Sequence, residues 1–194
     1  MNSQRPILPS QDDEALLLRD LRCEERRRGA FSKVISLYQE QLYWQIRRMV
    51  VNHDDARDVL QNTLMKAWQS LDKFRGDSRL STWLYTIAHN ESITFLTKRT
   101  AELEMTADDP SDYLKNLVET DVWFDGDETQ KQLRLAIASL PDKQRQVFNL
   151  RYYDEMPYEE MSQVLGTSVG ALKASYHFAV EKITRFLRTV DTSS

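Results

Sequence analysis

A short polar segment in the first half of the chain carries side chains suited to holding a single strand of nucleic acid. Residues 74–78 read FRGDS, and Arg79, Ser81 and Thr82 follow, with an aromatic residue directly after them. Single strands are held by basic contacts to the backbone and by aromatic platforms for the bases. A base taken out of its stack also needs contacts to its edge and faces. The segment offers both kinds of side chain in one short stretch.

A second segment that could bind nucleic acid lies near the end of the sequence. Residues 156–187 read MPYEEMSQVLGTSVGALKASYHFAVEKITRFL. Apolar spacing predicts a short helix from Tyr158 to about Leu165, a turn at Gly166, and a longer helix that Ser168 can cap. Two helices joined through a short turn with glycine form a helix-turn-helix, whose second helix enters the major groove of DNA. An ordinary helical hairpin has the same spacing, so this pattern alone leaves both interpretations open.

The residue types that carry catalysis or bind metals are scattered. No histidine has metal-ligand spacing to another histidine or to the one cysteine. These residues are His53, His89, His177 and Cys23. The acidic pairs Asp108-Asp109 and Asp125-Gly126-Asp127 lack the remaining ligands of a metal loop. With no glycine-rich phosphate loop either, we predict that the protein is not an enzyme and that it uses no metal or cofactor.

Helices must position these segments, because apolar residues recur at intervals of three and four through both halves. In the first half the expected helices cover about 30–51, 56–71 and 80–97. Asp54 and Asp55 can cap the second helix, and Gly76 breaks the pattern before the third. No stretch alternates with a period of two for long enough to form a strand. The predicted fold class is all-α.

Several aromatic side chains have a packing interpretation beside a functional one. Trp68 and Trp83 fall on the predicted inner faces of their helices, and Tyr176 falls on the inner face of the last one. We expect all three to pack inward. Phe74 can either contact a base or simply anchor the end of a helix.

The formal net charge of −4 over 194 residues is an average of unlike parts. Residues 1–100 carry 16 basic and 13 acidic side chains, and residues 129–194 carry nine and seven. Residues 101–128 carry ten acids and one lysine. We therefore expect two small helical domains, 1–100 and 129–194, joined by an acidic flexible linker. A second interpretation makes the linker a mimic of nucleic acid that occupies a basic groove.

The chain has the features of a cytoplasmic protein. It contains one cysteine, which excludes an internal disulfide framework. No apolar run approaches the roughly 18 residues that a membrane span needs. The first twenty residues mix Arg19 and four acids with their apolar stretch, which is not the layout of a signal peptide.

The two halves together resemble the extracytoplasmic-function (ECF) group of the sigma-70 family of RNA polymerase sigma factors. The segment from about Asp55 to Asn90 resembles region 2, through D-V-x-Q, F-R-G-D-S and T-W-L-Y-x-I-A-x-N. The segment from Leu140 to Ile183 resembles region 4. The resemblance implies that 1–100 binds core polymerase and recognises and melts the −10 element. It implies that 129–194 recognises the −35 element.

The resemblance also assigns the −10 residues. Phe74 and Asn90 would line a pocket for a flipped base, with Lys66 and Ser70 nearby. The full set of expected −10 contacts is Lys66, Phe74, Arg75, Gly76, Asp77, Ser78, Arg79, Ser81, Thr82 and Asn90.

A further set is expected to dock on the clamp helices of the polymerase. It comprises Asp58, Gln61, Asn62 and Met65. The family usually carries an acid after the glutamine, whereas this chain has Asn62 there, so one charge of the docking face is missing. A solvated polar face is the alternative interpretation.

For the −35 element the expected contacts lie on the exposed face of the second helix of the helix-turn-helix. They are Ser168, Ala171, Lys173, Ala174, Ser175 and His177. Many family members have arginines where this chain has Ser175, Phe178 and Val180. Fewer cations weaken phosphate binding and remove the side chains best suited to guanine edges. We predict a −35 preference that depends less on guanine.

The resemblance implies three partners: core RNA polymerase, contacted through its clamp helices and its flap, promoter DNA, and an anti-sigma factor, which in this family is often anchored in the membrane. The alternative function is a helix-turn-helix regulator that binds duplex DNA alone, with an N-terminal dimerisation or ligand domain. FRGDS and TWLY in register disfavour that alternative, because a dimerisation bundle needs neither.

Overall fold

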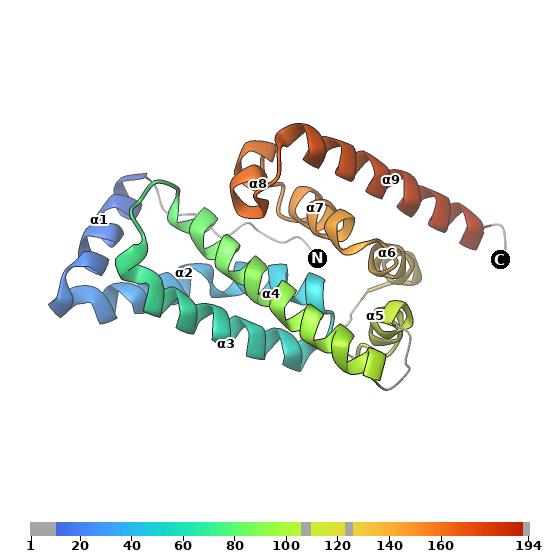
Figure 1. The fold of residues 1–194 in the computed structure, drawn as a ribbon, viewed down its shortest axis with the longest axis horizontal. Coiled ribbons are helices and arrows are strands. Elements are labelled where there is room, and N and C mark those ends of the chain that lie inside the picture. Colours follow the sequence, from blue (N-terminus) through green and yellow to red (C-terminus); the bar gives the residue numbers. More distant parts are fainter. Residues whose placement is uncertain (1–10, 106–109, 123–125, 192–194) are drawn as a thin grey trace.

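The computed structural model describes residues 11–105, 110–122 and 126–191, which form helices joined by turns (Figure 1). The first half contains α1 (Gln11–Arg22), α2 (Glu24–Val50), α3 (His53–Ser70), the 3₁₀ turn η1 (Leu71–Lys73) and α4 (Leu80–Met105). The rest contains α5 (Pro110–Glu119), α6 (Glu128–Ala138), α7 (Asp142–Tyr152), α8 (Tyr158–Leu165) and α9 (Val169–Asp191). Within these ranges there is no strand, which confirms the all-α prediction. None of the helices in the described ranges is long and apolar enough to cross a membrane.

The start of α3 differs from the prediction. Its N-cap is Asn52, whose side chain accepts from the backbone N–H groups of Asp54 at 2.9 Å and Asp55 at 3.0 Å. The two aspartates therefore lie in the first turn and do not cap it, so that prediction was wrong. Their charges still favour this position, because the N-terminus of a helix carries partial positive charge.

In the first half, α2, α3 and α4 pack together as a bundle, and α1 lies beside one end of it (Figure 1). The centre of the bundle is apolar and fully buried, and it includes Leu42 and Ile46 of α2 and Leu80 and Leu84 of α4. Two residues of α1, Leu17 and Leu21, join the same core. These contacts attach α1 to the bundle.

Of the three aromatic residues expected inside, Trp83 and Tyr176 are partly buried and Trp68 is exposed. Trp68 is 38% exposed and touches the bundle with its ring edge against Phe31, at 5.1 Å between centroids. Trp83 is half-buried against Phe74. Tyr176 is also half-buried and stacks on Phe148 at 5.8 Å. The inward position of Trp68 was a wrong prediction, because α3 places this residue at the rim of the α2–α3 contact.

The two halves share one hydrophobic core. Side chains of α7, α8 and α9 belong to the same buried cluster as the interior of α2 and α4. These side chains are Val147, Leu150, Met161, Val164 and Leu172. The C-terminal helices therefore lie directly against the first bundle, with α8 on α4 and α7 on α2 (Figure 1).

Polar contacts accompany this apolar interface. Arg48 Nη1 of α2 donates to Asp154 Oδ1 at 2.6 Å, and Asn149 Nδ2 donates to the carbonyl oxygen of Arg48 at 3.3 Å. Burial raises the pKa of Asp154, and the neighbouring Arg48 opposes that rise. At the other end of the interface, Thr82 Oγ1 of α4 donates to Glu160 Oε1 of α8 at 2.8 Å.

The described part of 101–128 is folded, unlike the flexible linker that we expected. Residues 101–105 continue α4, and α5 buries Leu114 and Val118 against Val51 and α6. Beyond α5, Asp121 accepts from Arg47 of α2 at 2.5 Å and from Arg134 of α6 at 2.6 Å. The acidic composition concealed an apolar stripe with helical spacing and a carboxylate that joins both halves.

Candidate nucleic-acid interface

The FRGDS segment forms a loop between η1 and α4. Phe74 closes η1, because its N–H donates to the carbonyl oxygen of Leu71 at 3.1 Å. Its ring lies 4.8 Å from the ring of Trp83, tilted by 31°. Gly76 has φ of +84°, a backbone conformation that residues other than glycine rarely adopt. The loop thus holds one half-buried aromatic ring and exposes Arg75, Gly76 and Asp77.

Both ends of this loop are tied to α1, a helix to which the sequence assigned no role. Arg22 Nη2 donates to the carbonyl oxygen of Arg75 at 3.1 Å. At the other end, Glu14 Oε1 accepts from the N–H of Leu80 at 2.5 Å, and Glu14 Oε2 lies 3.7 Å from Arg79 Nε. No local pattern could have predicted these contacts, because the residues that pair are more than fifty positions apart.

The predicted −10 residues fall into an open group and a covered one. Arg79 and Asn90 are exposed, and Ser78 is half-buried. Ser81 and Thr82 are buried, with 4% and 3% of their surface exposed. Thr82 faces α8, where its Oγ1 donates to Glu160 Oε1. In this arrangement only the open group is accessible from solvent.

Asn90 and Trp83 share a face of α4. Seven residues separate them, which is about two turns or ~10 Å along the axis. On the adjacent helix, Lys66 Nζ donates to Glu91 Oε1 at 2.5 Å; Lys66 is 55% exposed and Glu91 is 10% exposed. Sequence analysis missed Glu91, which sets the charge beside Asn90.

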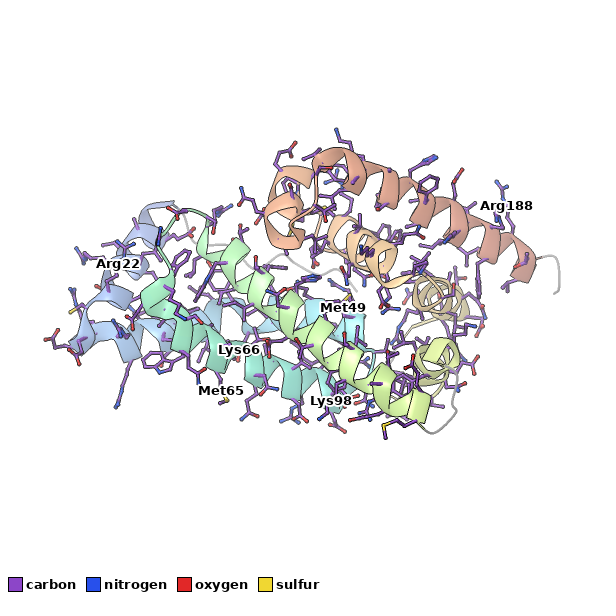
Figure 2. The ribbon with its side chains drawn as sticks, in the orientation of Figure 1. Arg22, Met49, Met65, Lys66, Lys98 and Arg188 are labelled. Atoms are coloured by element: carbon purple, nitrogen blue, oxygen red, sulfur yellow. The ribbon has the colours of Figure 1, made fainter. Side chains whose placement is uncertain are left out.

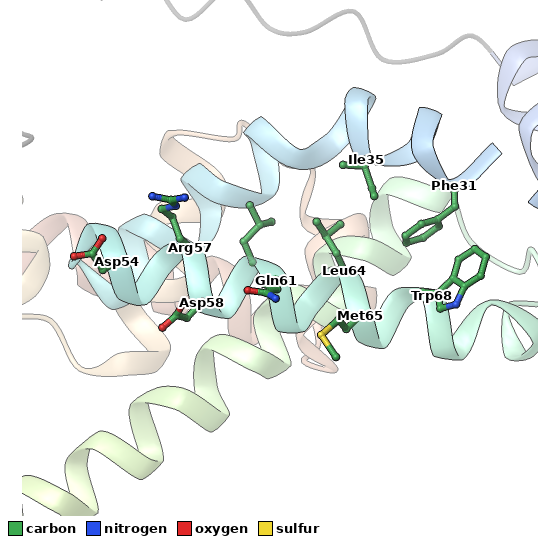
Figure 3. A pocket seen from close by; sticks show the side chains of 10 residues that line it. Phe31, Ile35, Asp54, Arg57, Asp58, Gln61, Leu64, Met65 and Trp68 are labelled. Carbon is green, nitrogen blue, oxygen red and sulfur yellow. The ribbon is translucent and has the colours of Figure 1, made fainter. Parts of the chain in front are cut away.

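An open groove runs between α2 and α3 (Figure 3). Three of the four residues expected to dock on the polymerase line it, namely Asp58, Gln61 and Met65; Asn62 is exposed on the same helix. Sequence analysis missed the apolar part of its wall. This part is made by Phe31, Ile35, Leu60, Leu64 and Trp68.

The groove combines apolar surface with charge at one end. Met65 is 52% exposed and points away from the bundle in Figure 2. Asp54, Arg57 and Asp58 gather at the end nearer the start of α3 (Figure 3). Such a surface suits a helical partner that brings apolar residues and charges of both signs.

The helix-turn-helix has the predicted geometry. Gly166 ends α8 in the left-handed conformation, with φ of +59°. Ser168 Oγ accepts from the N–H of Ala171 at 3.4 Å, so it caps α9 as expected. The first two turns of α9 then face solvent with Ala171, Lys173 and Ala174.

The rest of the candidate −35 surface carries little positive charge. His177 is exposed and lies 3.6 Å from Glu181, and Ser175 is half-buried. Phe178 and Val180 are 51% and 38% exposed. Apolar side chains are thus exposed to solvent at two positions where the resemblance leads one to expect arginines.

No three His, Cys, Asp or Glu side chains gather as a metal site in the described ranges.

Comparison with known families gives two matches in order along the chain. Residues 34–102 match Sigma-70 region 2, and residues 130–183 match Sigma-70, region 4. Among known proteins, RNA polymerase sigma-H factor of Pseudomonas aeruginosa is 30% identical over 190 residues, covering 94% of this chain and 97% of that protein. The ECF RNA polymerase sigma factor SigW of Bacillus subtilis is 28% identical, covering 82% of this chain and 89% of that protein.

Two solved complexes have a similar fold. RpoE in complex with the anti-sigma factor NepR from Bartonella quintana has a TM-score of 0.64 at 25% identity, covering 81% of this chain and 96% of that one. CnrH in complex with the cytosolic domain of CnrY has a TM-score of 0.66 at 24% identity, covering 91% and 97%.

Proposed function

Because the chain belongs to the ECF group of the sigma-70 family of RNA polymerase sigma factors, we propose that it binds core RNA polymerase and directs it to promoters by recognising −10 and −35 elements. The observation that carries this proposal is the presence of both regions in one chain, each with most of its candidate DNA-contacting residues on the surface.

Polymerase docking is assigned to the groove between α2 and α3. Its open shape, the exposed Met65 and Trp68, and the acidic Asp58 support a helical partner with complementary charge. Asn62 lies beside this groove at a position where the resemblance leads one to expect an acid, so apolar contact contributes a larger share of the docking energy here.

Recognition and opening of the −10 element are assigned to the Phe74–Arg79 loop and the adjacent face of α4. The arginines of the loop can contact phosphates, and Phe74 offers a ring face to an unstacked base. Asn90 adds an amide that can hydrogen-bond a base edge.

Recognition of the −35 element is assigned to the start of α9. Ala171, Lys173 and Ala174 present a small, weakly basic surface, suited to close approach in the major groove. With few cations on this face, the duplex contact is weak and depends little on guanine. Stable promoter binding then requires the polymerase.

An anti-sigma factor belongs to the same proposal. The similar protein RpoE was solved in complex with the anti-sigma factor NepR. We assign the corresponding role in this protein to a dedicated inhibitor.

Initiation in vitro tests the proposal directly. The purified chain is added to bacterial core RNA polymerase with a library of genomic fragments, and the 5′ ends of the transcripts are mapped. Specific start sites should require the chain, and the chain alone should bind the same fragments weakly. Tight, specific duplex binding without polymerase, and no initiation with it, would show a stand-alone regulator instead.

A further inference from the structure

The loop assigned to the −10 element is held by a helix that lies outside the matched regions. The Sigma-70 region 2 match begins at residue 34, whereas α1 covers Gln11–Arg22. This helix nevertheless contacts the loop at its start and at its end.

The start of the loop is fixed by two arginines. Arg22 Nη2 donates to the carbonyl oxygen of Arg75 at 3.1 Å and would lie 3.5 Å from a Cβ added at Gly76. Arg27, at the start of α2, donates to the carbonyl oxygen of Leu21 at 3.0 Å and pairs with Asp72 of η1 at 2.8 Å. The end of α1 and the entry to the loop are thereby joined on both sides of Phe74.

The end of the loop is fixed by a carboxylate. Glu14 is 7% exposed, and its Oε1 accepts from the N–H of Leu80, the first residue of α4. Ser78 Oγ of the loop donates to the carbonyl oxygen of Arg79 at 3.4 Å, and the N–H of Leu80 is met by the carboxylate of Glu14 from α1. A buried carboxylate is stabilised in this place by the partial positive charge of the helix N-terminus and by Arg79.

The side of α1 that carries Glu14 is the side that packs. Glu14, Leu17 and Leu21 are spaced by three and four residues and are all buried. The two leucines insert into the core formed by α2 and α4, which fixes where the Glu14 carboxylate lies relative to the start of α4. Leu16, by contrast, is 51% exposed on the outer side of the same helix.

We infer that α1 is a brace for the −10 loop, and that Glu14 and Arg22 are positioning residues that set its conformation without touching DNA. The inference rests on the proposed function of the loop. A loop held at both ends loses less conformational entropy when it captures an unpaired strand. Promoter opening therefore depends on a helix that contributes no side chain to the base pocket.

The first test measures the loop itself. Hydrogen exchange is followed on the free full-length chain for residues 74–82. Glu14→Ala and Arg22→Ala should each accelerate exchange in this segment, while Leu16→Ala leaves it unchanged. If residues 74–82 exchange no faster in Glu14→Ala and Arg22→Ala than in Leu16→Ala, the inference is overturned. This result does not depend on the choice of promoter, because no DNA is present.

The second test measures opening by the holoenzyme at a promoter recovered in the initiation assay, using permanganate reactivity of −10 thymines. Glu14→Ala should slow opening about tenfold, as expected for loss of one hydrogen bond to a charged group. Glu14→Gln keeps an oxygen for the Leu80 N–H and should restore most of the rate. Affinity for core polymerase should be unchanged, because the α2–α3 groove is not altered. If Glu14→Ala does not fold, the exposed Arg22→Ala variant carries the test.

Two reference variants separate this inference from the function it rests on. Phe74→Ala and Asn90→Ala should both slow opening. If neither does, the proposed role of the loop fails. If both do while Glu14→Ala and Arg22→Ala open the promoter at the wild-type rate, the brace alone is overturned.

Discussion

The residue that faces Lys66 reduces the positive charge of the surface that we propose for −10 DNA. Glu91 holds Lys66 at 2.5 Å from a position that is 10% exposed. A paired ammonium attracts a phosphate less than a free one, because its charge is already balanced. Sequence reasoning placed Lys66 at the DNA and missed the partner that competes for it.

Glu91→Gln should therefore strengthen binding of single-stranded DNA by the holoenzyme. The released Lys66 can neutralise one phosphate, which steepens the plot of log affinity against log salt concentration by about 0.7. Fluorescence anisotropy across a salt series measures this slope. Glu102→Gln, a substitution near the far end of α4 that also loses ion pairs, is the matched control, and equal slopes for the two variants would contradict the prediction.

The exposed apolar residues of α9 give a second prediction at this scale. Val180 is 38% exposed where the resemblance leads one to look for a cation. Val180→Arg should add one phosphate contact to the −35 duplex and steepen the salt slope by about 0.9. Band shifts with the duplex at several salt concentrations measure it. Thr189→Arg, nine residues further along α9, should leave the slope as it is; a similar gain from both variants would indicate non-specific attraction.

At the scale of elements, the segment between the two regions works as part of the fold. α5 packs against α6 through an apolar stripe, and Asp121 behind it accepts from Arg47 and Arg134. Burial by itself raises the pKa of Asp121, but the two arginines outweigh it, and the net pKa is lowered. The carboxylate is therefore ionised in the folded state and holds α2 and α6 together.

A substitution that removes this charge should destabilise the protein at neutral pH. Asp121→Asn keeps an oxygen acceptor but leaves two arginines without a counter-charge, at a cost of about 1–3 kcal/mol in the free energy of unfolding. Urea unfolding at neutral pH measures this difference. Glu119→Gln, at an exposed acid near the end of α5, should cost little.

The difference in unfolding free energy between wild type and Asp121→Asn should depend on pH. A carboxyl whose pKa is lowered on folding stabilises the protein above its unfolded pKa, and this stabilisation is lost as pH falls through the folded value. The gap between wild type and Asp121→Asn should therefore shrink on going from neutral pH to about pH 3. A gap that stays constant with pH would assign the effect to packing.

At the scale of the whole molecule, the two halves lie closed on one another. The interface places α8 beside α4 (Figure 1), where Glu160 pairs with the buried Thr82, and the Arg48–Asp154 pair ties α2 to the segment after α7. For Thr82 to touch DNA, α8 must leave α4. The closed arrangement and the use of Thr82 at a promoter therefore exclude each other.

Arg48→Ala should favour separation of the halves. It leaves Asp154, only 11% exposed and with no donor on its Oδ2 among the described residues, without its cation, at a cost of about 2 kcal/mol. Small-angle scattering of the free chain should show a larger radius of gyration, and the Thr82 segment should exchange hydrogen faster.

Two controls accompany this prediction. Asp154→Asn removes a carboxylate whose pKa is raised by burial, and it keeps an oxygen acceptor for Arg48. The two halves of this variant should therefore stay together. Arg28→Ala changes an exposed arginine elsewhere on α2. An unchanged radius in Arg48→Ala would mean that the apolar contacts alone keep the halves together.

The sequence by itself determined most of the helices, though not α1 or α5, together with the helix-turn-helix and most of the exposed candidate surface. These features depend on short-range physics: apolar spacing makes helix faces, Gly166 allows the left-handed turn, and Ser168 caps the helix that follows it. Each signal is contained within a few neighbouring residues and can be read without knowing the fold. The capping error at Asn52 was also local, because Asn52, Asp54 and Asp55 lie within four positions and each has a side chain that can cap a helix.

Only the tertiary structure decided what holds the −10 loop, what covers it and what joins the two regions. The Glu14–Leu80, Thr82–Glu160 and Arg47–Asp121 contacts each link residues at least 66 positions apart. A carboxylate or a hydroxyl looks the same in sequence whether it faces water or a distant donor. Its partner is chosen when the helices pack, because only then does burial make an unpaired polar group costly.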